Sequence, residues 1–276
     1  MRIDLHTHTT VSDGKLKPLE LCQRAASRGV QFLSITDHDT CAAYRELSEI
    51  VSLPVQLIPG IEFSSYWKST GIHILGLNLN LQSTILKSAI DYQQTARTLR
   101  AKQIAVRLEK HGIENTLPHV KRIAGNTYIG RPHFAQHLVD IGRVNNIKDA
   151  FRKFLGPGKP GDVKENWAPL GQIVDWIREA GGIAVLAHPA KYGLTWTKLG
   201  ALLDEFFAAG GRGMEVISGQ QQPELTRRLG TLSVQKRLLA SCGSDFHRPE
   251  DTWSDVGQFC DLPDECTPVW HNWELA

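Results

Sequence analysis

The sequence lacks long hydrophobic runs, and this absence excludes one class of protein. No stretch of its 276 residues approaches the roughly 20 apolar residues that a membrane-spanning helix needs. The first six residues also lack the hydrophobic run of a signal peptide and lead directly into a strand pattern. We therefore expect a cytoplasmic protein that has no membrane partner.

Cysteine is scarce, and neither sign of charge dominates. No pair of cysteines has the C-x-x-C spacing of a thiolate metal site, so we expect free thiols in a reducing compartment. Cys260 and Cys266 leave open a pairing or a metal role near the C-terminus. The net charge of +2 gives no chain-wide signal for nucleic acid, so any basic patch has to be local. Nothing indicates an obligatory protein partner.

Short apolar strands alternate with helices along most of the chain. Strand patterns recur at residues 3–8, 32–36, 55–58, 72–77, 183–187, 214–217 and 238–241. The strand at 55–58 is expected to end at Pro59-Gly60, and a helix is expected over residues 18–29. Such alternation indicates an α/β fold with a parallel sheet. Seven strands in one chain favour a barrel over an open sheet.

The middle of the chain breaks this rhythm. A long helix is expected from about residue 83 to 112, and shorter helical pieces follow, bounded by the Pro/Gly run at 156–161. We predict that residues 1–98 and 165–276 form the main domain, and that residues 99–164 form a helical insertion, or cap. Basic residues lie within or just before it: Arg97, Arg100, Lys102, Arg107, Lys110, Lys121, Arg122 and Arg131. They form either solvated helix faces or a phosphate-facing surface.

Histidines and carboxylates stand at or just beyond the strand ends. His6 and His8 project to the same side of their strand, because side chains two residues apart share a face. The others are Asp13, Asp37, His38, Glu62, His73, His188, Asp245 and His247. Any one of them alone would more often be structural, but the strand-end rim of a β/α barrel is where sites assemble. Imidazole with carboxylate suits Zn, Mn or Fe, and the surplus of ligands predicts two or three divalent ions.

The order of four motifs resembles the polymerase and histidinol phosphatase (PHP) superfamily. These motifs are His6-x-His8 with Asp13, Asp37-His38, His188-Pro189 and Asp245-x-His247. The runs at 60–62, 130–133 and 248–253 are similar to a stand-alone, TrpH-like subgroup that includes nucleoside 3′,5′-bisphosphate phosphatases and a 5′–3′ exoribonuclease. The resemblance covers essentially the whole chain. It implies a distorted (β/α)7 barrel with a di- or trinuclear metal site.

Carried over residue by residue, the resemblance implies three metal sites. The first would use His6, His8, Glu62 and Asp245; the second Glu62, His73 and His188; and the third Asp13, His38 and His247. Many family members have His in the position of Asp13, and a hard oxygen ligand there favours Mn or Fe over Zn. The implied nucleophile is a metal-bridging hydroxide held by Glu62 and neighbouring ligands. Asp4, Asp37 and Asp39 are interpreted as partners that orient imidazoles, with an ordinary strand-end cap as the alternative.

Candidate substrate residues lie mainly in the insertion. Arg131 precedes Pro132, which is favoured in the first turn of a helix, so Arg131 and His133 predict an anion site at a helix start. A structural role for both is the alternative. Lys191 and Ser218 are weaker phosphate candidates. Three aromatic residues could stack on a base, although packing is their commoner fate: Tyr128, Tyr192 and Trp196.

The function implied by the resemblance is hydrolysis of a nucleotide or short RNA. We expect the 3′-phosphate of nucleoside 3′,5′-bisphosphates, or the first linkage of 5′-phosphorylated RNA, to be cleaved with manganese as the favoured cofactor and iron or zinc as alternatives. One alternative is a small-metabolite phosphatase of the histidinol-phosphatase kind. The other is a non-catalytic, metal-bound scaffold.

Overall fold

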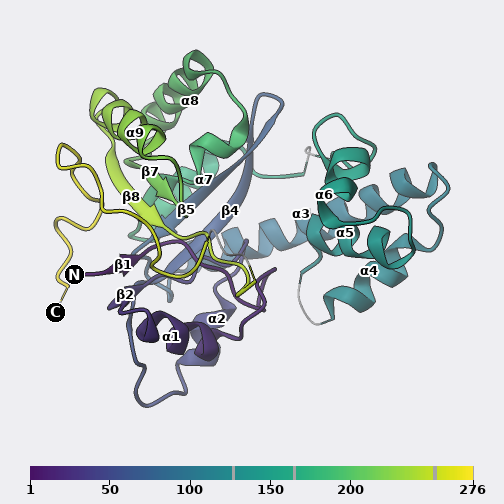
Figure 1. Cartoon of the computed structure of the whole chain (residues 1–276), viewed down its shortest axis with the longest axis horizontal. Coiled ribbons are helices and arrows are strands. Elements are labelled where there is room, and N and C mark those ends of the chain that lie inside the picture. The colour runs from purple at the N-terminus through teal and green to yellow at the C-terminus, as the bar shows by residue number, and fades with distance from the viewer. Residues whose placement is uncertain (126–127, 164–165, 251–253, 276) are drawn as a thin grey trace. The chain divides into compact units, whose positions relative to one another are not determined.

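The computed structural model describes residues 1–125, 128–163, 166–250 and 254–275, and it is a mixed α/β structure (Figure 1). The chain divides into two compact units. The first comprises Met1–Ile90 with Ala168–Ala276, and the second comprises Asp91–Trp167. The boundary expected between residues 164 and 165 lies outside the described residues, as do Asp251, Thr252 and Trp253 of the run at 248–253.

A small parallel sheet opens the first unit. Its strands β1 (Ile3–Asp4), β2 (Phe32–Leu33) and β3 (Gln56–Leu57) pair in that order. Helices α1 (Pro18–Ser27) and α2 (Ala42–Leu47) connect them. Pro18 begins α1, and the Glu20 carboxylate accepts the Lys17 backbone N–H at 2.8 Å, so the helix starts where the sequence predicts.

A five-stranded sheet forms the rest of the first unit's strand core. Its order is β4 (Gly60–Trp67), β5 (Thr70–Leu77), β6 (Ile183–Leu186), β7 (Gly213–Ser218) and β8 (Leu239–Gly243). The strands β6, β7 and β8 are parallel, but β5 pairs antiparallel with both β4 and β6. The expectation of a wholly parallel sheet is therefore wrong at β4 and β5.

The strand β4 is the element that the sequence patterns missed. The strand expected at 55–58 is β3, which ends before Pro59 as expected, but Gly60 then begins a second, longer strand that carries Glu62. A Cβ atom on Gly60 would lie 2.2 Å from Ser34 Oγ. Glycine is needed here because a neighbouring segment approaches closely, and it does not mark a chain reversal.

Hydrogen bonds beyond the regular strands link the two sheets at both edges. Leu5 N donates to Cys242 O at 3.2 Å and His8 N donates to Phe246 O at 2.9 Å, which joins β1 to the β8 side. At the other edge, Asp39 N donates to Glu62 O at 2.9 Å. These links bring the ends of β1, β2, β4 and β8 together.

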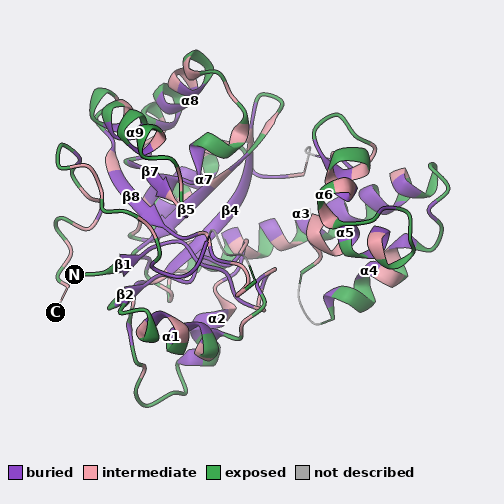
Figure 2. Ribbon diagram, in the orientation of Figure 1, coloured by how far each residue is buried: buried purple, intermediate pink, exposed green. Residues whose placement is uncertain are grey.

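Helices cover the five-stranded sheet and leave their outer faces exposed (Figure 2). They are α7 (Leu170–Glu179), α8 (Trp196–Ala208) and α9 (Pro223–Gln235), with a short 3₁₀ helix, η2 (Pro189–Tyr192). The core between strands and helices contains Phe63, Ile74, Val185, Phe206 and Val216.

The second unit is built from helices in its described part. They are α3 (Thr84–Glu109, which starts before the unit), α4 (Thr116–Ala124), α5 (Arg131–Asp140), α6 (Ile147–Ala150) and a π-helix, η1 (Phe151–Leu155). Its core contains Ile104, Leu108, Val120, Phe134 and Leu138. The sequence of this unit holds fourteen Lys and Arg against seven Asp and Glu, a local excess of positive charge.

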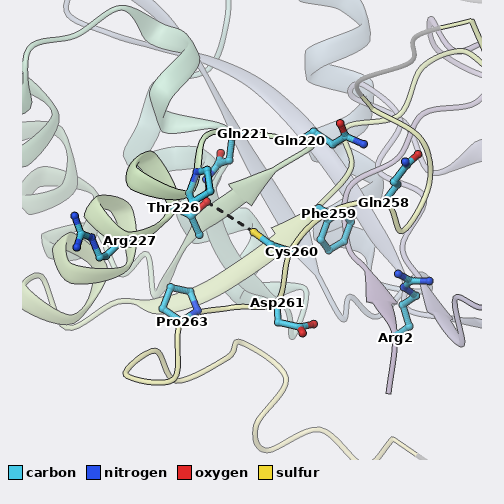
Figure 3. A pocket seen from close by; sticks show the side chains of 11 residues that line it. Arg2, Gln220, Gln221, Thr226, Arg227, Gln258, Phe259, Cys260, Asp261 and Pro263 are labelled. Atoms are coloured by element: carbon cyan, nitrogen blue, oxygen red, sulfur yellow. Dashed lines mark hydrogen bonds between the residues drawn. The ribbon is translucent and has the colours of Figure 1, made fainter.

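A pocket of about 590 Å³ lies beside the start of α9 (Figure 3). Gln221, Thr226 and Cys260 are among its lining residues, and Thr226 Oγ1 lies 3.9 Å from Cys260 Sγ. All five cysteines are free, so Cys260 and Cys266 do not form a disulfide. Among the described residues, none of the helices has the length and apolar character to cross a membrane.

Candidate metal centre

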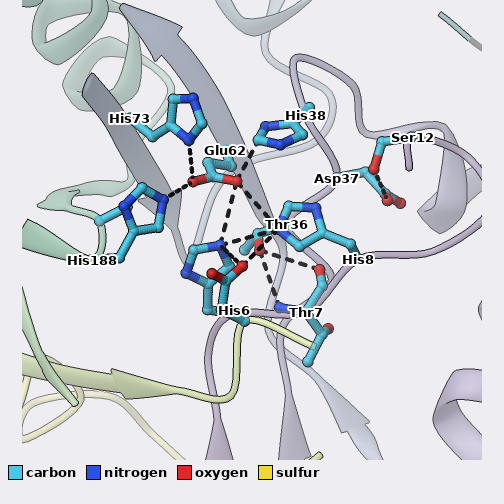
Figure 4. A network of polar contacts seen from close by, with 12 residues as sticks. His6, Thr7, His8, Ser12, Thr36, Asp37, His38, Glu62, His73 and His188 are labelled. Carbon is cyan, nitrogen blue, oxygen red and sulfur yellow. Dashed lines mark hydrogen bonds and ion pairs between the residues drawn. The ribbon is translucent and has the colours of Figure 1, made fainter. Parts of the chain in front are cut away.

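Glu62 stands at the centre of a cluster of imidazoles (Figure 4). Its carboxylate is buried on β4, and its Oε1 atom lies 2.8 Å from His73 Nδ1 and 3.0 Å from His188 Nε2. Its Oε2 atom lies 3.3 Å from His6 Nε2, 3.2 Å from His8 Nε2 and 3.1 Å from His38 Nδ1. One carboxylate thus faces five histidines, four of which follow the ends of β1, β2 and β6, while His73 lies on β5.

Two further carboxylates complete the cluster. Asp245 Oδ1 lies 3.3 Å from His6 Nε2 and 3.4 Å from His8 Nε2. Asp13 Oδ1 lies 3.5 Å from His247 Nε2, and Asp13 Oδ2 lies 3.8 Å from His38 Nε2. The structure therefore gathers all nine predicted ligands in one place.

The spacing of these atoms fits metal ions. Ligands about 2.1 Å from a tetrahedral ion stand about 3.4 Å from one another, which is the separation seen between many of these atoms. Within the described residues, His8 Nδ1 is buried and has no hydrogen-bond partner, and His38 Nδ1 makes no hydrogen bond although it lies 3.1 Å from Glu62 Oε2. In the part of the chain that the structure describes, four groups have ligand atoms within 4.8 Å of one another: His6–His8–Asp245, His6–Glu62–His188, His38–Glu62–His73 and His8–Asp13–His38–His247.

The charges of the cluster are strongly coupled. Burial favours neutral His6, but the carboxylates of Glu215, Glu62 and Asp245 outweigh it and raise the pKa of His6 well above its ordinary value. The same competition raises the pKa of His8 to about 10. Burial opposes ionisation of Glu62 too, yet the surrounding imidazoles hold its pKa well below the usual range. The carboxylates stay ionised, and a bound cation would replace protons on the imidazoles.

The backbone is strained where it delivers these side chains. Asp39, His188 and Asp245 have positive φ angles of 55°, 28° and 53°, in a region that residues other than glycine rarely adopt. His188 and Asp245 each lie two residues beyond a strand end, and Asp39 lies in the segment that follows β2. Strain of this kind persists where the surrounding structure enforces it and is concentrated at functional sites.

Asp4 and Asp37 hold the loops around the ligands. The Asp4 carboxylate accepts the backbone N–H groups of Ser244 at 2.9 Å and Gly257 at 2.8 Å. Asp37 accepts Thr9 N at 2.8 Å and Ser12 Oγ at 2.6 Å, which fixes the loop that leads to Asp13. These bonds go to backbone and hydroxyl groups, as in the strand-end cap alternative.

Asp39 has a similar role beside β4. It accepts the backbone N–H of Ser64 at 2.8 Å and its hydroxyl at 3.0 Å. These bonds tie the segment after β2 to the strand that carries Glu62. The segment that carries His38 is therefore held beside Glu62.

Glu215 is a carboxylate beside the cluster that the sequence patterns missed. It is fully buried on β7, its Oε1 atom accepts the His6 Nδ1–H at 2.9 Å, and its Oε2 atom accepts the His188 backbone N–H at 2.5 Å. The available signal was a single carboxylate inside the apolar run 214–217, because an ionised residue is rarely buried without a partner.

The two candidate phosphate residues of the first unit differ in their surroundings. The Lys191 ammonium donates to Asp245 Oδ2. Ser218 lies at the end of β7, with its hydroxyl buried and without a hydrogen-bond partner among the described residues. The Tyr192 hydroxyl donates to Ala187 O at 2.6 Å and accepts His73 N at 3.0 Å, and Arg228 lies over the Trp196 ring. Tyr192 and Trp196 therefore make the packing contacts stated as their alternative.

Arg131 and His133 belong to the second unit. The helix α5 begins at Arg131, as the sequence predicts, and His133 Nδ1 accepts the Gly130 backbone N–H at 3.0 Å. The Arg131 guanidinium lies 5.8 Å from the centre of the Phe151 ring, and burial lowers its pKa. Tyr128, the third aromatic candidate, is exposed.

Comparisons with known proteins agree with this geometry. A family model described as "PHP domain" matches residues 4–150. The chain is 41% identical over 274 residues to the 5′–3′ exoribonuclease Rnm of Escherichia coli K12, and the match covers 98% of this chain and 93% of that protein. It is 39% identical to the 3′,5′-nucleoside bisphosphate phosphatase of Chromobacterium violaceum, with 99% and 96% covered.

A solved structure from Bifidobacterium adolescentis is also similar. It is described as a proposed metal-dependent phosphoesterase, with a TM-score of 0.76 and 27% sequence identity. The match covers 97% of this chain and 92% of that one. The similarity therefore extends over both units of the chain.

Proposed function

The chain belongs to the PHP family and is a metal-dependent phosphoesterase, and from that premise we propose that it removes the 3′-phosphate of nucleoside 3′,5′-bisphosphates and degrades short 5′-phosphorylated RNA from the 5′ end. The observation that carries the proposal is the convergence of five imidazoles on Glu62, with Asp13 and Asp245 beside them. The names of the Escherichia coli and Chromobacterium violaceum relatives support the substrate class.

We propose that two or three divalent ions bind here, with Mn²⁺ favoured and Fe²⁺ or Zn²⁺ as alternatives. His6, His8 and Asp245 with Glu62 would hold one ion, Glu62 with His73 and His188 would hold a second, and Asp13 with His38 and His247 would hold a third. When bound, such ions lower the pKa of a water molecule and balance the charge that gathers on the phosphoryl oxygens.

The chain's own residues would organise this chemistry. Glu62 faces ligands on both sides through its two oxygens, so it would keep neighbouring ions at a fixed separation. Asp245 would balance their charge, and the Lys191 ammonium beside it would be available to a phosphate oxygen once a cation satisfies Asp245. Ser218 is a weaker candidate for the same task.

We propose that Arg131 and His133 bind the phosphate that is not cleaved. The Arg131 guanidinium stands at the first residue of α5, and a guanidinium at a helix start suits a phosphate dianion. The excess of positive charge in the second unit supports a polyanionic substrate. If this group holds a 5′-phosphate, the scissile phosphorus is the one attached at the 3′ position, both in a bisphosphate and in the first linkage of RNA.

We also propose that the first unit is a distorted (β/α)7 barrel and that the helical insertion at 99–164 is a cap. The hydrogen bonds between β1 and β8 and between the β2 end and β4 support closure of the two sheets into one barrel. The predominantly parallel pairing supports it as well, because ligand-bearing strand ends then face one rim.

Short RNA tests this function. The manganese-loaded protein should release 5′-mononucleotides in order from the 5′ end of a 5′-phosphorylated oligoribonucleotide, and it should act poorly on the matched 5′-hydroxyl oligomer. Release that starts at the 3′ end would contradict the substrate assignment. Faster hydrolysis of histidinol phosphate than of any nucleotide would favour the small-metabolite alternative. No hydrolysis of any phosphoester would favour the scaffold.

A further inference from the structure

Glu215 is a carboxylic acid side chain buried in a strand whose packing calls for an apolar residue at that position. It is 0% exposed on β7, and its chain neighbours Met214 and Val216 are buried apolar residues. Taking a carboxylate out of water costs several kcal/mol unless good partners compensate it, and apolar residues often replace such groups without loss of stability. Its presence therefore calls for a role other than packing.

Both hydrogen-bond partners of Glu215 are residues of the candidate metal centre. Oε1 accepts His6 Nδ1–H at 2.9 Å and Oε2 accepts the His188 backbone N–H at 2.5 Å. The pairing of β7 with β8 shifts between Glu215 and Ile217, so a bulge follows Glu215 directly. Bulges near active sites redirect side chains, and this one accompanies the turn of the carboxylate toward the two histidines.

The first of these bonds fixes a tautomer. When Nδ1 of His6 donates to Glu215, the proton of the neutral ring is on Nδ1 and the lone pair is on Nε2. That Nε2 atom lies 3.3 Å from both Glu62 Oε2 and Asp245 Oδ1, so the lone pair is presented where an ion would bind. A carboxylate behind a ligating histidine has this orienting effect.

The second bond holds a strained turn. His188 has a φ angle of 28° and precedes Pro189, so its conformation is unfavourable without support. The bond from its backbone N–H to Glu215 keeps the turn in place, and His188 Nε2 then lies 3.0 Å from Glu62.

We propose that Glu215 is a positioning residue of the metal centre, which sets the tautomer of His6 and the backbone of His188 so that each presents Nε2 beside the shared carboxylate of Glu62. The inference rests on the metal centre of the proposed function. Glu215 is not placed in contact with substrate or metal. Its role is to hold two ligands, one on each side of Glu62, in the geometry that ion binding requires.

The test compares Glu215→Gln with the control Ser241→Ala. Glutamine keeps the size of the side chain but removes the charge and turns an amide N–H toward one of the two donors. Ser241 pairs with Glu215 across β7 and β8, and its buried hydroxyl has no hydrogen-bond partner among the described residues. Its removal perturbs the same place in the sheet without touching a histidine.

The full chain is stripped with a chelator and titrated with Mn²⁺ in a calorimeter. Glu215→Gln should weaken Mn²⁺ binding about 10- to 100-fold, while its metal-free melting temperature stays close to that of the wild type. The Co²⁺-loaded protein should also show a changed visible absorption spectrum. Ser241→Ala should match the wild type in all three measurements. Unchanged Mn²⁺ affinity in Glu215→Gln, or an equal loss in Ser241→Ala, would overturn the inference.

A second variant tests the same role if Glu215→Gln does not fold. Glu215→Asp keeps the charge but is too short to reach both donors, so its Mn²⁺ affinity should lie between that of the wild type and the loss expected above. Wild-type affinity in Glu215→Asp would contradict the role. Because metal binding is measured without substrate, a wild type that binds Mn²⁺ but cleaves no nucleotide would refute the proposed function alone. A wild type that binds no Mn²⁺ would refute both.

Discussion

The Tyr44 hydroxyl ties together the segments that lead into the metal centre, and its removal should have a large effect. Tyr44 Oη accepts the backbone N–H of Ile35 at 3.0 Å and of Gly60 at 2.8 Å, and it lies 2.8 Å from Ile35 O and 2.9 Å from Ile58 O. The change Tyr44→Phe leaves two buried N–H groups without this acceptor. Each orphaned group costs about 1–3 kcal/mol, so the free energy of unfolding should fall by about 2–6 kcal/mol.

Urea unfolding of the metal-free protein measures this loss. The midpoint should fall with little change in the slope, because the surface exposed on unfolding stays the same. The control is Tyr128→Phe, an exposed tyrosine whose change should stay within about 0.5 kcal/mol. Since Ile35 and Gly60 each lie two residues before a site residue, Asp37 and Glu62, the variant should also bind metal more weakly. A loss below about 1 kcal/mol would refute the hydrogen-bond reasoning.

Three further outcomes follow from the same structure. Dialysis against a chelator should abolish phosphate release, and added Mn²⁺ should restore it, whereas activity that survives metal removal would contradict the metal centre. Arg131→Ala should lower kcat/KM for a bisphosphate by about 10- to 150-fold, with most of the effect in KM. This loss corresponds to about 1.5–3 kcal/mol for a lost charged hydrogen bond. An equal loss on 3′-AMP would show that the assigned role is wrong. Burial lowers the pKa of His137 below 6.5, so the unfolded chain binds a proton at this residue more readily than the folded chain does. The free energy of unfolding should therefore fall as pH drops below about 6.5. His137→Leu should flatten that slope in a denaturation series from pH 7.5 to 5, and an unchanged slope would exclude His137 as the cause.

The strand ends that carry the ligands could be predicted, but one strand could not. Apolar strand patterns identified β1, β2, β3, β5, β6, β7 and β8. The strand β4 was missed because a Pro-Gly pair commonly marks the end of a strand. Gly60 instead lies at the start of β4, where the absence of a Cβ atom lets the Ser34 side chain approach. Because β4 was missed, its antiparallel pairing with β5 was missed as well.

Some residues of the candidate site could likewise be predicted from their spacing in the sequence, and others could be found only in the folded structure. The nine candidate ligands could be selected because imidazoles and carboxylates recur at strand ends, and these side chains converge in the structure. Glu215 could not be selected in this way, because it lies within an apolar strand and acts through His6 and His188, which are distant in sequence. Supporting groups of this kind are defined by tertiary contacts, and local pattern carries little information about them.

The central claim is tested most directly by the product formed from adenosine 3′,5′-bisphosphate. The manganese-loaded protein is incubated with this substrate, and its nucleotide products are separated by chromatography and compared with 3′-AMP and 5′-AMP. The account predicts one phosphate and one 5′-AMP for each substrate molecule, with little hydrolysis of 3′-AMP or 5′-AMP under the same conditions. Formation of 3′-AMP, or faster hydrolysis of 3′-AMP than of the bisphosphate, would contradict it.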